Sequence, residues 1–377
     1  MTTYYYYPDA AGANDGTSEA DAWTAIASAT AAVAAGDTVY MKNGASRDGS
    51  GADVTFSTDG SDTGQIRLKG YTSTEEDTGL FQTSDKFFFN GDNHRIENID
   101  FEGGTTIVPV ITTDGGNNLF QNCKIVSTYT STNGKAIEVT KEAALVDCYI
   151  ESTDSNFSTS KIGAIYVASG DSVSVQGCVI RGNVGLGAQD PYTGVIFVSD
   201  CIFTDATNKP MQAGIEIDVE YGSNGWYWIT NNTFYGFSDE GIRYTQMFGA
   251  TDHKNNVVMN NIFWGDGSAG SAGIENDDAG QTATIHFLNN AIGNVDTDYL
   301  DFASDITDNI GTVSLSVDPF VDGANLDFRL NNTSGGGADC RATATPVTAF
   351  HGTPLTLNRK DLGAVQHSGL VERVSVG

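Results

Sequence analysis

A short phrase recurs eight times between Arg95 and Ile292, and this repeat constrains the fold more than any other feature of the sequence. Each copy ends in a large apolar residue, and successive copies lie 23 to 31 residues apart. The end positions are Phe101, Ile125, Ile150, Ile180, Phe203, Phe234, Phe263 and Ile292. A period of this length is typical of a solenoid, in which one coil buries its apolar face only against its neighbours.

The pattern inside each copy predicts two strands separated by a sharp corner. Side chains alternate in and out along a strand, and this parity slips by one residue before the last strand of the phrase. The residue at the slip is always of a type that tolerates a bend: Asn98, Asn122, Asp147, Gly177, Asp200, Asn231, Asn260 and Asn289. Stacked copies therefore place equivalent side chains above one another, roughly 4.8 Å apart.

The next position in the phrase predicts a ladder along the corner. It holds Cys123, Cys148, Cys178 and Cys201, and then Asn232, Asn261 and Asn290. The three Asn residues are expected to form an amide ladder. The four Cys residues could form a disulfide or metal ladder, or simply stack in the core. We favour stacked thiols because the total of five cysteines is odd and no Cys-x-x-Cys motif is present.

The repeat indicates one elongated domain rather than two. An Ala-rich stretch from Asp21 to Ala35 places Trp23, Ile26, Thr30 and Val33 on one helical stripe and predicts a capping helix that covers the first coil. We therefore divide the chain into an N-terminal arm (1–20), a capping helix with the parallel β-helix (21–311), and a C-terminal segment (312–377) that closes the second end or makes oligomer contacts. Abundant Gly (44) and scarce Pro (7) suit this all-β reading.

The formal net charge of −29 disfavours nucleic acid and anionic membranes as partners. Neutral sugars, and acidic sugars bridged by cations, remain compatible with it. Met1–Pro8 has no basic start followed by an apolar run, so we expect no cleaved signal peptide, and no stretch is long enough to span a membrane. No motif calls for a cofactor or a metal.

A second column of strands lies between the copies and carries the candidate catalytic residues. Its strands include Gly214–Asp218, Gly241–Thr245 and Gly273–Asp277, each with an inward Ile. Glu216 and Glu275 should therefore point outward two coils apart, with Arg243 between them. Two coils span roughly 9–10 Å, near the upper end of the carboxyl separation in inverting glycosidases. Asp218 and Asp277 repeat the offset in the next outward column. The alternative is an Arg that bridges two carboxylates on a solvated face.

Aromatic residues form the second set of candidates. Tyr235 and Trp264 occupy the outward position after Phe234 and Phe263, whereas Trp226 and Trp228 flank an inward Tyr227. Flat exposed rings suit the faces of sugars, and they equally suit burial under loops or between subunits. We assign these four residues, with Arg243, to substrate binding.

Taken together, these residues resemble the right-handed parallel β-helix proteins of the pectate-lyase-like superfamily. Gly36-Asp37-Thr38-Val39-Tyr40 looks like the usual start of such a helix, and Asp318-Pro319-Phe320, Asp327–Leu330 and Asp361–Ala364 look like closing phrases of bacterial and phage members. The resemblance implies lyases, glycosidases, esterases or phage tailspikes, and the fold does not choose among them. Asn276-Asp277-Asp278 matches part of a polygalacturonase pattern, but no Gly-His-Gly or Arg-Ile-Lys follows, and the Trp-Ile-Asp-His phrase of pectate lyases is missing.

Among the members of this superfamily, the missing signal peptide favours a phage tailspike-like or tail-associated protein that binds, and could depolymerise, host surface polysaccharide. The resemblance implies a homotrimer in the virion tail, attached through a tail or adaptor protein. A free extracellular polysaccharide lyase or glycosidase is the second hypothesis, and a non-enzymatic virion decoration protein is the third.

Overall fold

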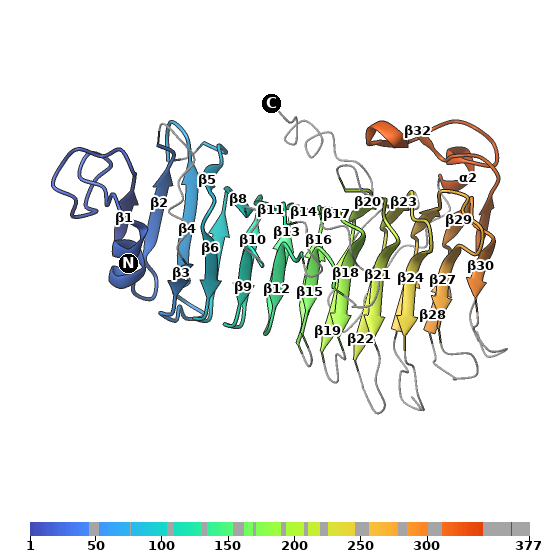
Figure 1. The fold of residues 1–377 in the computed structure, drawn as a ribbon, viewed down its shortest axis with the longest axis horizontal. Helices are drawn as coiled ribbons and strands as arrows, with labels where there is room; N and C mark the ends of the chain where they lie inside the picture. Colours follow the sequence, from blue (N-terminus) through green and yellow to red (C-terminus); the bar gives the residue numbers. More distant parts are fainter. Residues whose placement is uncertain are drawn as a thin grey trace.

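The computed structural model describes residues 1–44, 53–75, 77–103, 109–129, 134–153, 162–168, 171–189, 194–206, 210–218, 225–245, 256–277, 285–300, 311–341 and 363. In this part of the chain, three parallel sheets wind around one apolar core and form the elongated solenoid of Figure 1. The predicted fold class, an all-β right-handed parallel β-helix, is confirmed.

The sheets, called A, B and C, contain 11, 10 and 10 strands among the described residues. Sheet A consists of β1 (Thr3–Tyr6), β2 (Thr38–Lys42), β4 (Ile66–Tyr71), β7 (His94–Glu97), β10 (Asn118–Gln121), β13 (Ala143–Val146), β16 (Val173–Gln176), β19 (Val195–Ser199), β22 (Trp226–Thr230), β25 (Asn256–Met259) and β28 (Ile285–Leu288). Sheet B consists of β5 (Phe81–Thr83), β8 (Ile99–Gly103), β11 (Lys124–Ser127), β14 (Tyr149–Ser152), β17 (Val179–Arg181), β20 (Ile202–Thr204), β23 (Thr233–Tyr235), β26 (Ile262–Trp264), β29 (Ala291–Gly293) and β31 (Val313–Leu315).

Sheet C consists of β3 (Asp53–Phe56), β6 (Lys86–Phe89), β9 (Ile111–Thr113), β12 (Ile137–Val139), β15 (Ile165–Val167), β18 (Val184–Gln189), β21 (Ala213–Asp218), β24 (Glu240–Thr245), β27 (Ala272–Asn276) and β30 (Thr297–Leu300). The remaining elements are α1 (Ile26–Ala32), the antiparallel pair β32 (Phe320–Asp322) and β33 (Asp327–Leu330), the 3₁₀ turn η1 (Gly323–Asn325) and α2 (Gly337–Cys340).

The corner between sheets A and B is made by one left-handed residue per coil. The eight residues predicted to bend the chain all have positive φ, from 49° at Asn289 to 65° at Gly177. L-residues enter this region at a cost, and Asn, Asp and Gly enter it most readily. The composition of that column is thus explained by backbone geometry, as the sequence predicted.

The next residue of each coil forms the predicted ladder, which continues from amides to thiols. The backbone N–H of Asn232 donates to Oδ1 of Asn261 (2.8 Å), and the N–H of Asn261 donates to Oδ1 of Asn290 (3.1 Å). In the preceding coils, the N–H of Cys178 donates to Sγ of Cys201 (3.4 Å). All five cysteines are buried and free, so the prediction of stacked thiols is confirmed, and burial raises the pKa of the Cys123 and Cys178 thiols.

A stack of aromatic rings fills the core beside this corner. Phe203, Phe234 and Phe263 stack in parallel with ring centroids 4.7 Å apart, which is the spacing of adjacent strands. Glycine in sheet C makes room for them, since a Cβ on Gly241 would lie 2.3 Å from Cδ1 of Phe263. The same arrangement holds for Gly214 and Phe234.

The N-terminal end differs in detail from the prediction. Residues 1–20 were expected to be an arm, but Thr3–Tyr6 is the first strand of sheet A and pairs in parallel with β2. The predicted helix at 21–35 is shortened to Ile26–Ala32, because Trp23 forms a β-bridge with Tyr6 and its backbone exchanges hydrogen bonds with that strand. The segment before α1 therefore covers the open edge of β1, which is the capping role expected of the helix.

The described part of the C-terminal segment packs on the side of the solenoid. Phe320, Phe328 and Cys340 join an apolar cluster with Ile202 and Ile262, whose side chains point outward from sheet B. In Figure 1, β32 and α2 lie on the side of the solenoid that carries β20, β23 and β29. The closing phrase Asp361–Ala364 lies outside the described residues, apart from Gly363.

We predict that Asn261→Ala weakens the solenoid because it leaves the N–H and the side-chain amide of Asn232 without their acceptor in the core. A buried donor that loses its partner costs on the order of 1–3 kcal/mol. Urea unfolding followed by circular dichroism measures this loss, with the exposed Asn325→Ala as the control. Equal stability of the two variants would contradict a supporting role for the ladder.

Candidate functional site

The outer face of sheet C brings the main catalytic candidates together. In register, Glu216 of β21 pairs with Arg243 of β24, and Arg243 pairs with Glu275 of β27. The inward neighbours Ile215, Ile242 and Ile274 are fully buried. The alternation that buries these Ile residues fixes the outward direction of the charged side chains.

Arg243 is held by carboxylates on two sides. Its Nε donates to Oε2 of Glu275 (3.2 Å), and its Nη2 donates to Oε1 of Glu240 (2.7 Å). Burial opposes its charged form, yet the charges of Glu240, Glu216 and Glu275 raise the pKa of the guanidinium above its usual value. We call Glu216, Glu240, Arg243 and Glu275 the Arg243 cluster.

Glu240 is the member of this cluster that the sequence did not reveal. It begins β24, one residue before the predicted strand Gly241–Thr245. Its register partners are Ala213 and Ala272. These small neighbours leave room for the Glu240 side chain, which is only 4% exposed. The signal that could have found it is a carboxyl residue at a position where the adjacent coils carry Ala.

The surroundings of Glu240 favour its protonated form at neutral pH. Burial, a hydrogen bond with Glu275 and the negative charge of Glu275 outweigh the attraction of Arg243 and raise the pKa of Glu240 to about 9. A carboxyl group with a pKa above neutrality thus lies beside the Glu275 side chain. Pairs of neighbouring carboxyl groups in which one pKa is strongly raised are common where acid and base chemistry occurs.

The second acidic pair from the sequence is not symmetrical. Asp218 is buried and accepts a hydrogen bond from Oγ1 of Thr245 (3.2 Å). Asp277 follows β27 and is exposed. The two carboxyls therefore differ in environment, and Asp218 lies beside the Arg243 cluster in the neighbouring outward column.

Toward the N-terminus, the outer face of sheet C carries a row of interacting polar side chains. β18 lies between β15 and β21, so Tyr166 lies two coils from Glu216. The Gly-rich sequence of β18 and its short coil concealed this strand. Tyr166 donates to the side chain of Gln189, and its ring lies 3.8 Å from Nζ of Lys135. Lys135 also binds Glu138 (2.8 Å).

Trp226 and Trp228 lie on a different face, the outside of sheet A. Trp226 is 37% exposed beside Val195, and the Trp228 ring lies 6.4 Å from Phe197, whereas Tyr227 points inward as predicted. A shallow groove of about 270 Å³ lies next to them along sheet A, lined in part by Leu119, Ala144, Ser174, Val195 and Phe197. These indoles and the Arg243 cluster therefore face different directions.

Tyr235 and Trp264 lie on the third face, beneath the C-terminal segment. The Tyr235 ring packs edge-on against Phe320 and Phe328, its hydroxyl donates to Asp318 (3.3 Å), and Trp264 joins the same apolar cluster. Burial and the nearby Asp318 raise the pKa of Tyr235 to about 12. Tyr235 and Trp264 are therefore partly buried under another segment of the chain, which is the alternative to sugar binding.

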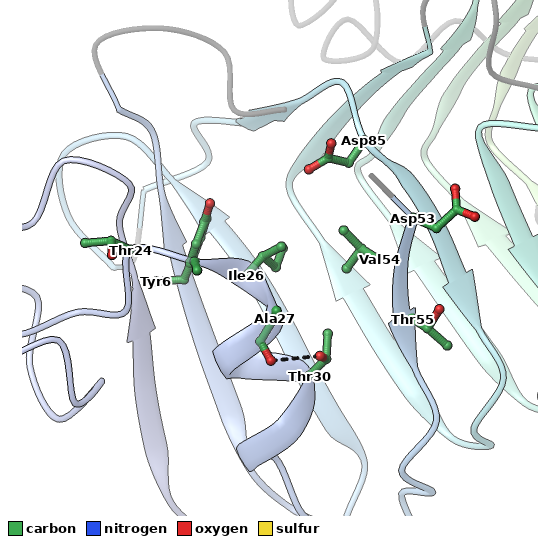
Figure 2. Close-up of a pocket in the computed structure, with 10 residues that line it drawn as sticks. Tyr6, Thr24, Ile26, Ala27, Thr30, Asp53, Val54, Thr55 and Asp85 are labelled. Carbon is green, nitrogen blue, oxygen red and sulfur yellow. Dashed lines mark hydrogen bonds between the residues drawn. The ribbon is translucent and has the colours of Figure 1, made fainter. Parts of the chain in front are cut away.

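A pocket of about 300 Å³ lies at the N-terminal end, between α1 and β3 (Figure 2). Ile26, Ala27 and Thr30 line one side of it, and Asp53, Val54 and Thr55 line the other. It belongs to the first coils of the solenoid, whereas β24 and β27 lie toward the opposite end in Figure 1. This pocket is thus separate from the Arg243 cluster.

The described residues hold neither a metal-binding cluster nor a helix able to span a membrane. They contain no group of three or more His, Cys, Asp or Glu side chains arranged to hold a metal ion. None of the helices that the structure describes has the length and apolar character that a membrane span requires.

Comparisons with known proteins agree with this architecture. A family profile described as a right-handed beta helix region matches residues 85–246. A search of curated proteins found no match. Among solved structures, a crystal structure of pectate lyase Pel9A superposes with a TM-score of 0.64 at 18% identity, covering 97% of this chain and 96% of that chain.

Two further structures are more distant. A rhamnogalacturonan lyase gives a TM-score of 0.47 at 14% identity, with 77% of this chain and 87% of that chain covered. A mannuronic acid specific family 6 lyase from human gut microbiota gives 0.44 at 14% identity, with 80% and 66% covered. At these identities the pectate lyase similarity shows the fold, and the two lower scores add nothing to it. The chain has the right-handed parallel β-helix fold, which the pectate lyase structure shares.

We predict that Glu240→Gln removes a pH dependence of stability. A carboxyl whose pKa rises from about 4.3 when unfolded to about 9 when folded contributes stability at low pH, and this contribution is lost as the pH rises through that window. The melting temperature of the wild type should therefore fall between pH 5 and pH 9 relative to that of the variant. The Gln side chain keeps the acceptor for Arg243 and cannot ionise.

The exposed Glu142→Gln provides the control, and its melting curve should follow that of the wild type across the same range. Parallel curves for Glu240→Gln and the wild type would show that Glu240 is ionised in the folded protein.

Proposed function

We propose that the outer face of sheet C binds a polysaccharide and that the Arg243 cluster hydrolyses it. The observation that carries this proposal is the buried Glu240 carboxyl, whose pKa is raised to about 9, bound with Glu275 to one guanidinium, with Glu216 on the other side of Arg243. An acid and a base held on one face are the two groups that glycoside hydrolysis requires. The likeness of the fold to a pectate lyase supports a polysaccharide as the ligand class.

In this mechanism the Glu240–Glu275 pair holds one proton and acts as the general acid. Glu275 is the more exposed partner, so it delivers the proton to the glycosidic oxygen and is resupplied by Glu240. Glu216 removes a proton from water, whose oxygen bonds to the anomeric carbon as the bond to the leaving oxygen breaks. The strands of Glu216 and Glu275 are two spacings apart, roughly 9–10 Å, which is close to the separation of about 6.5–9.5 Å in inverting enzymes.

Arg243 orients the two carboxylates and the sugar in this proposal. In the competing β-elimination, an Arg or Tyr would remove the proton beside a sugar carboxylate. The raised pKa of Arg243 makes its deprotonation harder. Burial, Glu138 and Asp218 likewise raise the pKa of Tyr166. These shifts favour hydrolysis over elimination by either residue. Asp277 is exposed beyond the cluster, and we propose that it contacts a neighbouring sugar unit. Asp218 is buried, so its proposed role is to position Thr245 through their hydrogen bond.

Trp226 and Trp228 are proposed to contact a glycan outside the cleavage site, since they lie on the outside of sheet A. Tyr235 and Trp264 keep a substrate-binding role only if the C-terminal segment moves away from sheet B. Both proposals need binding data on variants of these residues.

The biological setting is a further proposal. A phage tailspike-like or tail-associated protein would act on host surface polysaccharide as a homotrimer in the virion, attached through a tail or adaptor protein. A free extracellular glycosidase or lyase and a non-enzymatic virion protein are the alternatives. Light scattering on the untagged protein should give the mass of a trimer if the first is correct, whereas a monomer that releases oligosaccharides would identify a free enzyme.

We predict that Glu216→Gln and Glu275→Gln each lower glycan cleavage by at least about 100-fold, the usual effect of removing a catalytic acid or base. Reducing ends and ultraviolet absorbance of the products, measured on a panel of capsule and cell-wall polysaccharides, would separate hydrolysis from elimination. Glu138→Gln, in the same outward column but outside the cluster, serves as the control and should cleave normally. Unchanged turnover in both cluster variants would rule out this site.

A further inference from the structure

We infer that the sheet C site selects glycans without acidic groups at the cleavage point, that is, neutral polysaccharides. This inference rests on the proposed function, because it concerns the ligand of the same site. It separates this chain from the uronate substrates that pectate and mannuronic acid lyases are named for.

The first argument is the balance of charge on the described part of this face. Between β12 and β27 its cations are Lys135, which precedes β12, and Arg243. The carboxyl residues of the same stretch are Glu138, Glu216, Asp218, Glu240, Glu275 and Asp277. Even with Glu240 protonated, the face stays negative, and the net charge of −29 on the whole chain adds repulsion at long range.

The second argument is that both cations are already engaged. Nε and Nη2 of Arg243 bind Glu275 and Glu240. Lys135 binds Glu138 and lies over the Tyr166 ring. An incoming uronate would have to displace a carboxylate that the fold holds in place, and the displaced carboxylate would then lie close to a second anion.

The third argument is that the groups on this face match hydroxyl donors. Ionised carboxylates accept hydrogen bonds and donate none, and their bonds from O–H groups are short and strong. Glu216 and Glu275 offer such acceptors in one column, and the exposed Gln189 amide lies in the next. A neutral sugar presents several hydroxyls to acceptors of this kind and meets no repulsion.

The test is binding by isothermal calorimetry to two sets of hexasaccharides of equal length. The neutral set contains galactose, mannose and N-acetylglucosamine oligomers, and the acidic set contains galacturonate and mannuronate oligomers. Each is measured with Glu240→Gln protein, which keeps the charge of the face and removes the proton that cleavage uses, at 20 and 200 mM NaCl, with and without 2 mM CaCl₂ (concentrations of about this size suffice to change screening).

We expect at least one neutral oligomer to bind at least about tenfold more tightly than either uronate at low salt, which corresponds to 1.4 kcal/mol. Its affinity should change little with salt. Any uronate binding should strengthen at the higher salt concentration, because screening weakens repulsion between like charges. Glu138→Gln, added to the same protein, should raise uronate affinity at low salt and leave the neutral oligomer unaffected.

Two results would overturn the inference in different ways. Uronate binding equal to or tighter than neutral binding, with or without calcium, would reject the neutral class while leaving a polysaccharide site on sheet C standing. Binding of neither set, together with no cleavage of the polysaccharide panel, would reject the proposed function itself.

Discussion

The stacking of equivalent residues at the spacing of adjacent strands is the constraint on which the rest of this structure depends. A left-handed residue turns every coil by the same amount. The backbone N–H of the residue after it donates a hydrogen bond to an amide oxygen or a thiol sulfur of the next coil. Because each coil repeats the geometry of its neighbour, the phenylalanine rings inside the corner stack at 4.7 Å. One repeated turn thus sets the core, the sheets and the spacing of every outward column.

The same constraint governs the chemistry of the surface. Stacking brings the outward side chains of adjacent coils within contact distance, whether their charges attract or repel each other. In the Arg243 column an Arg lies between two Glu residues of opposite charge, and burial raises the pKa of the adjacent Glu240 to about 9. A site of this kind needs no loop to assemble it. Because the three sheets face different directions, the Arg243 cluster, the sheet A groove next to Trp226 and the sheet B surface beneath the C-terminal segment lie on separate faces.

The proximity that makes an acid–base pair available also makes this face negative. The proposed hydrolysis of a neutral sugar would use both properties, since it needs a proton donor, a base and acceptors for hydroxyls. Elimination from a uronate instead needs a cation free to neutralise the sugar carboxylate, and both Arg243 and Lys135 are already bound to carboxylates of the fold. Charge on one face therefore links the reaction class to the substrate class.

The sequence by itself determined the coils, the bend residues, the ladder and the alignment of Glu216, Arg243 and Glu275, because these follow from the period of the repeat and from the alternation of side chains along a strand. It could not supply Glu240, whose role depends on small partners in adjacent coils, nor β18, whose glycines hide the alternation. It also could not place Tyr235 and Trp264 beneath the C-terminal segment or separate them from Trp226. Those outcomes were decided by tertiary structure, since a repeat specifies neighbours along the stack but not which segment folds back over a face, nor how burial changes the charge of a carboxyl group.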